Sequence, residues 1–120
     1  MSTVQNTKLY NLSQLEMLSR GDDGFVNKML NSFTGNLKDG IKEITDAYKL
    51  HDWSTIGKVA HKLKPSMLVL GVTSLKETII FLEKDHKDGS VDEKEISMKV
   101  ESFLEKCGIL LMQIQQISNN

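Results

Sequence analysis

His61 and Lys64, three residues apart, are the two side chains of this sequence whose types and spacing best suit joint chemistry. Residues at that spacing lie one turn apart on the same side of an α-helix, so the two side chains would face the same space. A histidine imidazole titrates near neutrality, and one ring nitrogen then carries a free lone pair that can act as a nucleophile. A lysine ammonium beside it can offset the charge of an anionic group that the imidazole accepts. A single exposed histidine is nevertheless more often inert than functional.

The residues around His61 predict that it lies on the exposed side of an amphipathic helix. On an ideal helix of about 100° per residue, the apolar side chains form one stripe roughly opposite His61, which predicts the face that packs in the core. That stripe consists of Ile56, Val59, Ala60, Leu63, Met67 and Leu70. The residues within about 60° of His61 on the same helix are Ser54, Gly57, Lys58, Lys64, Pro65 and Leu68. We therefore expect His61 to face solvent beside cations, a glycine and one outward-facing leucine.

The segment 61–72 resembles the signature of the histidine-containing phosphotransfer (HPt) domain of multistep bacterial phosphorelays. The family signature is His-x-Leu-Lys-Gly-Ser, then three or four mostly apolar residues, then Leu-Gly and a small residue. The matching positions here are His61, Leu63, Lys64, Ser66, Leu70 and Gly71. Pro65 stands where the family most often has glycine, and Val72 replaces the usual alanine. The helical pattern described below extends the resemblance over nearly the whole chain.

The resemblance implies a phosphocarrier in phosphorelay signal transduction. Members of the family accept a phosphoryl group on the exposed histidine from a receiver-domain aspartate and pass it to another receiver domain. By this likeness His61 is the predicted phosphoryl acceptor and Lys64 the cation that stabilises the phosphoryl charge. The implied partners are receiver domains of response regulators and a hybrid sensor histidine kinase, and the receiver supplies the aspartate and the magnesium ion. Glu83 and Lys87 fall where some relatives place polar groups near the histidine, but a solvated helix face explains them equally well.

Contact with a partner protein is predicted for four residues near His61. Gly57 lies one turn earlier, and the absence of a side chain would let another protein's backbone come close. Leu68 is apolar although it faces the His61 side, so we expect it to pack against a docking receiver domain. Lys58 adds positive potential. Pro65 removes an amide that would bond to the His61 carbonyl, at a typical cost of about 3 kcal/mol, so we expect a kink just after His61.

The motifs of an autonomous enzyme do not occur in this sequence. It has neither a phosphate-cradling glycine loop nor a kinase signature set, so we expect no ATP site, no cofactor and no self-phosphorylation. The three histidines, His51, His61 and His86, lack close ligand spacing and predict no metal site. The alternative function is a phosphate-independent helical adaptor that binds a receiver or kinase. Pro65 keeps that alternative open, whereas the presence of both His61 and Lys64 favours the phosphocarrier.

Composition predicts one ordinary soluble domain spanning residues 1–120. The chain is 39% hydrophobic and 26% charged, and its length allows a core without disulfides or metals. A net charge of −1 argues against non-specific nucleic-acid binding. The single cysteine, Cys107, cannot form an internal disulfide and is predicted to be a small buried residue. With no membrane-length apolar run and no signal sequence, the chain is expected to be cytoplasmic. We also expect a monomer, because one exposed face must stay open for transient docking.

The hydrophobic periodicity predicts an all-α fold, an antiparallel up-down four-helix bundle with a short extra N-terminal helix. A capping-box pattern at Ser13-Gln14-Leu15-Glu16 predicts the start of the short helix, which stops near Gly21. Asp22 or Asp23 can cap the next helix. Its apolar positions are Val26, Leu30, Phe33, Leu37, Ile41, Ile44 and Tyr48. Two glycines, at positions 35 and 40, interrupt it and allow a bend, since each lowers helix propensity by roughly 1 kcal/mol relative to alanine.

The boundaries of the remaining helices follow from capping residues. Asp52 is a good N-cap for the His61 helix, and Gly71 ends that helix as a C-terminal glycine. The next apolar stripe runs out at 84–89 and consists of Val72, Leu75, Ile79 and Leu82. Asp92, with Glu95 three residues later, opens the last helix. Its positions alternate by four and three residues, as in a seam between near-parallel helices, and are Ile96, Val100, Phe103, Cys107, Leu110, Ile114 and Ile117.

Overall fold

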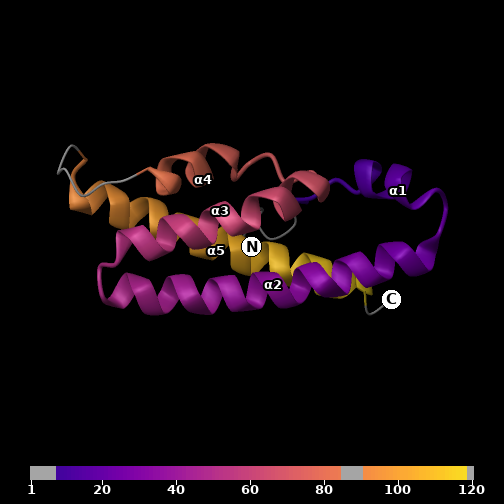
Figure 1. The fold of residues 1–120 in the computed structure, drawn as a ribbon, viewed down its shortest axis with the longest axis horizontal. Helices are drawn as coiled ribbons and strands as arrows, with labels where there is room; N and C mark the ends of the chain where they lie inside the picture. Colours follow the sequence, from indigo (N-terminus) through magenta and orange to yellow (C-terminus); the bar gives the residue numbers. More distant parts are fainter. Residues whose placement is uncertain (1–7, 85–90, 119–120) are drawn as a thin grey trace, which may run out of the picture.

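The computed structural model describes residues 8–84 and 91–118 of the chain (Figure 1). These residues form five α-helices and no strand, so the prediction of an all-α fold is confirmed. The helices are α1 (Ser13–Ser19), α2 (Asp23–Lys49), α3 (Trp53–Val69), α4 (Lys76–Glu83) and α5 (Glu93–Ser118). Principal-axis extents of 49, 32 and 21 Å describe an elongated molecule. No helix within the described residues has both the length and the apolar character needed to cross a membrane.

The helices lie along the long axis of the molecule, and consecutive helices from α2 to α5 run in opposite directions (Figure 1). α2 packs against both α3 and α5. The shorter α4 packs on α3 and also contacts α5, while α1 folds back against α2. As a result, α3 lies between α2 and α4 (Figure 1).

Two aspartates cap the helices that they were predicted to cap. The Asp22 side chain accepts a hydrogen bond from the Phe25 N–H at 3.2 Å, at the start of α2. At the start of α3, Asp52 accepts from the Thr55 N–H at 3.2 Å and from the Thr55 hydroxyl at 2.6 Å. Each cap satisfies a backbone donor that the first helical turn leaves unpaired. The Asp52 cap therefore fixes where α3 begins and, through the helix repeat, which way its side chains face.

Gly71 ends α3 as predicted, in a Schellman motif. Its φ angle of 64° lies in the left-handed region. The Val72 N–H donates to the Met67 carbonyl at 2.9 Å, and the Gly71 N–H donates to the Leu68 carbonyl at 3.1 Å. A side chain at this position would also clash, because a Cβ on Gly71 would lie 2.5 Å from the Asn11 carbonyl oxygen. The backbone angle thus favours glycine, and the close passage of the N-terminal segment leaves no room for a Cβ.

The predicted capping box of the first helix is wrong. α1 does begin at Ser13, but its N-cap is Leu12, which makes no side-chain cap hydrogen bond. The Ser13 N–H instead donates to Asn11 Oδ1 at 2.9 Å. The Asn11 N–H in turn donates to the Leu70 carbonyl at 2.8 Å. A contact with the end of α3 therefore sets the entry into α1, which a local capping pattern could not reveal.

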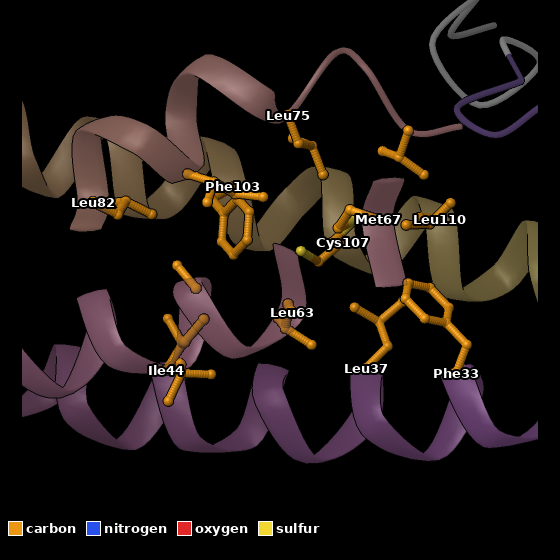
Figure 2. Packing of buried hydrophobic residues seen from close by; sticks show 14 of the residues in the cluster. Phe33, Leu37, Ile44, Leu63, Met67, Leu75, Leu82, Phe103, Cys107 and Leu110 are labelled. Carbon is orange, nitrogen blue, oxygen red and sulfur yellow. The ribbon is translucent and has the colours of Figure 1, made fainter. Parts of the chain in front are cut away.

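The predicted apolar stripes form the core (Figure 2). All six stripe residues of α3 are buried, namely Ile56, Val59, Ala60, Leu63, Met67 and Leu70. The α5 seam is buried from Ile96 to Ile114, and the stripe from Val72 to Leu82 is buried although α4 itself begins only at Lys76. Cys107 lies in this core, and burial raises the pKa of its thiol to about 12. The interpretation of Cys107 as a small buried residue is confirmed, and its thiol is unreactive at neutral pH.

Gly40 marks the close approach of α2 to α3. α2 continues through both of its predicted interruptions, and Gly40 is buried. A Cβ on Gly40 would lie 3.0 Å from the Leu63 Cδ1 atom, so the missing side chain makes room for Leu63. This packing fixes the buried side of α3 and leaves the opposite side, with His61, facing outward.

Candidate functional site

His61 lies on the outer side of α3, as predicted, with 73% of its side chain exposed. One ring nitrogen, Nδ1, lies 3.1 Å from the Oε1 atom of Glu83. Glu83 is the last residue of α4, which packs beside α3. The imidazole is therefore largely exposed to solvent, while its Nδ1 atom contacts a carboxylate.

The Glu83 carboxylate also binds Lys64. The Lys64 ammonium lies 3.4 Å from each of the two Glu83 carboxylate oxygens. Glu83 itself is only 21% exposed. Its partial burial raises the carboxyl pKa, but the hydrogen bonds from His61 and Lys64 and the charge of Lys64 outweigh this, and the net result is a pKa below the ordinary value of 4.5. Glu83 is therefore ionised at neutral pH.

An ionised Glu83 determines which nitrogen of His61 carries the proton. A carboxylate can only accept hydrogen bonds, so Nδ1 must be the donor in this contact. In the neutral imidazole the other nitrogen, Nε2, then holds the lone pair. Because the side chain is largely exposed, Nε2 is the nitrogen able to attack an electrophile that approaches from solvent.

Lys64 completes what we call the His61–Lys64–Glu83 cluster. It follows His61 by one turn on α3 and is half-buried. Surface ion pairs of this kind contribute only about 0–1 kcal/mol to stability. The importance of the cluster is therefore chemical: it places a nucleophilic nitrogen, a cation and a proton-holding carboxylate on one surface.

Gly57 does not lie open to a partner, and that prediction is wrong. The residue is buried, and a Cβ there would lie 2.5 Å from the Leu82 carbonyl oxygen. α4 of the same chain occupies the space that the helical wheel left free. The wheel places Gly57 correctly relative to His61 but carries no information about which neighbouring helix covers that side.

The other three predicted contact residues are exposed. Lys58 and Pro65 face solvent, and Leu68 is 53% exposed. α3 continues through Pro65 to Val69, so the proline does not end the helix. Pro65 also lines an open apolar hollow of about 250 Å³ between α2 and α3, together with Met29, Ser32, Phe33, Asn36, Ser66, Val69 and Leu70.

His51 has a similar contact to that of His61 but lacks its surroundings. Its Nδ1 atom lies 2.7 Å from Glu93 Oε1, and its ring stacks on Trp53 with 5.3 Å between ring centroids. Among the ion pairs of the described residues, no lysine shares Glu93 with His51 as Lys64 shares Glu83 with His61. His51 is therefore a natural internal control for His61.

The remaining sequence candidates include two residues of which the structure gives no description. His86 and Lys87 lie outside the described residues. Within the part of the chain that is described, no three His, Cys, Asp or Glu side chains are arranged to hold a metal ion. Glu83, whose role the sequence left open, is the residue that links His61 to Lys64 in the cluster.

The lowered pKa of Glu83 predicts how acid affects stability. Between the folded pKa and 4.5, the unfolded chain binds more protons than the folded protein, so stability should rise with pH over this interval and be lost as pH falls through the folded pKa. We expect Glu83→Gln to flatten this part of the profile. Urea unfolding between about pH 3 and 6 measures it, with Glu77→Gln as the control for removing an exposed carboxylate from the same helix. An unchanged slope in Glu83→Gln would contradict the ionised cluster.

No family model, no curated protein and no solved structure matches this chain. The functional assignment therefore depends on the geometry of the cluster and on the motif of α3.

Proposed function

We propose that this chain is a phosphocarrier of a phosphorelay, which accepts a phosphoryl group on His61 from a receiver-domain aspartate and passes it to another receiver domain. One observation carries the proposal. The Nδ1 atom of an exposed histidine contacts a carboxylate that also binds a lysine one turn away, which leaves Nε2 as the nitrogen with the lone pair. The all-helical fold with antiparallel neighbours supports the finer assignment of a four-helix bundle with an extra N-terminal helix, the architecture of the HPt family.

The transfer step can be written with its atoms and charges in balance. The Nε2 lone pair of His61 attacks the phosphorus of the aspartyl phosphate, an N–P bond forms, and the acyl O–P bond breaks to leave an aspartate carboxylate on the partner. Nδ1 keeps its proton throughout, so the ring becomes cationic as the bond forms. The reverse sequence, with a different receiver aspartate as the acceptor, delivers the phosphoryl group onward.

Each residue of the cluster has a distinct role in this step. Glu83 accepts the Nδ1 hydrogen bond and stabilises the positive charge that develops on the ring. Lys64 offsets negative charge on the phosphoryl oxygens as they arrive beside Nε2. The partial exposure of Lys64 leaves its ammonium free to turn from Glu83 toward the phosphoryl group.

The exposed surface around His61 suits a transient protein partner. Lys58, Pro65 and Leu68 present a cation and two apolar groups beside the nucleophile. The acidic phosphorylation site of a receiver domain is complementary in charge to Lys58 and Lys64. We assign the chain no catalytic activity of its own, and we place it in the cytoplasm as a monomer whose open face docks receivers weakly.

Transfer of a radioactive phosphoryl group from a phosphorylated receiver domain to this chain tests the proposal. Label on His61 supports the phosphocarrier. A receiver that binds the chain while no label moves would contradict it and favour the phosphate-independent adaptor.

A further inference from the structure

We infer that Gly57 is a positioning residue for His61, because the absence of its side chain lets α4 lie close enough for Glu83 to reach the imidazole. The kinetic consequence rests on the proposed function. The geometric claim does not, because it concerns only the placement of Glu83 and the proton on His61.

The contact at Gly57 involves the backbone of α4. A Cβ on Gly57 would lie 2.5 Å from the Leu82 carbonyl oxygen and 3.5 Å from the Glu83 Cα atom. Backbone atoms cannot rotate out of the way as the end of a flexible side chain can. An added methyl group would therefore displace the end of α4 itself.

The displaced segment is the one that carries the carboxylate. Gly57 precedes His61 by one turn of α3, and Leu82 directly precedes Glu83 at the end of α4. Restoring an ordinary contact of at least 3.4 Å would move the Leu82 carbonyl by almost an ångström. The Glu83 carboxylate lies 3.1 Å from the His61 Nδ1 atom and 3.4 Å from the Lys64 ammonium. Both distances are near the upper end of the hydrogen-bond range, so a small further increase would weaken these bonds.

Loss of the Glu83 contact would release the proton from its fixed position. A neutral imidazole without a partner exchanges its proton between the two nitrogens, and the tautomer present is set by the hydrogen bond that one of them makes. Part of the population would then carry the proton on Nε2, and a protonated Nε2 has no free lone pair with which to attack phosphorus. The structure thus assigns to Gly57 an influence on the nucleophile that acts entirely through α4 and Glu83.

Side-chain nitrogen NMR of His61 tests this inference directly. At about pH 9, above the ordinary titration range of histidine, the shifts of Nδ1 and Nε2 report which nitrogen carries the proton. We expect a predominantly Nδ1-protonated ring in the wild type and the same shift toward Nε2 protonation in Gly57→Ala and Glu83→Ala. Gly35→Ala is the matched control, because it is also a glycine within a helix but has open space around its Cβ position.

A double variant, Gly57→Ala combined with Glu83→Ala, separates an effect of Gly57 on the position of Glu83 from a general disturbance of the fold. If Gly57 acts through Glu83, Gly57→Ala adds no further tautomer shift and no further loss of phosphoryl-transfer rate to a chain that already carries Glu83→Ala. A folded Gly57→Ala protein that keeps the wild-type tautomer would overturn the inference. A tautomer shift without any phosphoryl transfer in the wild type would support the positioning role while contradicting the proposed function.

A second variant keeps the inference testable if Gly57→Ala does not fold. Glu83→Asp leaves the Gly57 contact intact but withdraws the carboxylate by one methylene. We expect it to shift the tautomer as Glu83→Ala does. If the shorter Asp side chain holds the Nδ1 proton as well as Glu83, the close approach at Gly57 is not required and the inference is wrong.

Discussion

His61→Ala is expected to abolish phosphohistidine formation when the chain is treated with phosphoramidate, a small phosphoryl donor, whereas His51→Ala is expected to react like the wild type. Of the two histidines that the structure describes, only His61 combines an Nδ1 contact to a glutamate with a lysine that shares that glutamate. His51 is 62% exposed and its Nδ1 also contacts a glutamate, so the two histidines are similar in exposure and in this contact. The difference between the variants therefore isolates the contribution of the whole cluster. Intact-mass measurement of the acid-labile phosphorylation, with peptide mapping of its position, measures this difference between the variants.

The two histidine substitutions also control for stability. Both replace an exposed histidine whose contact with a glutamate should contribute only about 0–1 kcal/mol, so both variants should remain folded. Modification of His61→Ala at the wild-type rate would contradict the assignment of His61, as would loss of modification in a folded His51→Ala protein.

Phe103→Ala is expected to destabilise the fold by about 3–5 kcal/mol, the typical effect of truncating a buried aromatic side chain. Phe103 lies on α5 with none of its surface exposed, and Figure 2 shows it in the interior among other buried side chains. Its removal takes away apolar burial and leaves a cavity where α5 meets its neighbours. Urea or guanidinium unfolding followed by circular dichroism measures the change in free energy.

Met112→Ala provides a matched control on the same helix. Met112 is exposed, and truncation of an exposed side chain usually changes stability by no more than about 0.5 kcal/mol. Similar losses for Phe103→Ala and Met112→Ala would contradict the described core. A small loss of stability for Met112→Ala with a large one for Phe103→Ala would support the described packing of α5 in the core.

The features that could be predicted from the sequence depend on local chemistry. Asp52 caps α3 because its carboxylate needs only the N–H groups of the next turn. Gly71 ends α3 because its left-handed backbone angle favours a residue without Cβ. The burial of Leu63 and the exposure of His61 follow from the helix repeat within a single segment.

The features that could not be predicted depend on contacts between segments far apart in the chain. Glu83 meets His61 only because α4 folds back along α3, and no pattern within either helix specifies that register. Gly57 was expected to face a partner because the helical wheel gives an angle but not the neighbour that occupies it. The capping of α1, but not its start, differs from the prediction for the same reason, since Asn11 accepts from the Ser13 N–H and is itself held by the end of α3.

Phosphoryl transfer from isolated receiver domains tests the central claim most directly. Each receiver of a panel is labelled with radioactive acetyl phosphate, freed of excess donor, and mixed with the wild-type chain or with His61→Ala. We predict that label leaves at least one receiver, appears on the wild-type chain alone as acid-labile and base-stable phosphate, and moves on when a second, unlabelled receiver is added. Receivers that bind the wild-type chain in solution, yet keep their label until it hydrolyses, would contradict the phosphocarrier.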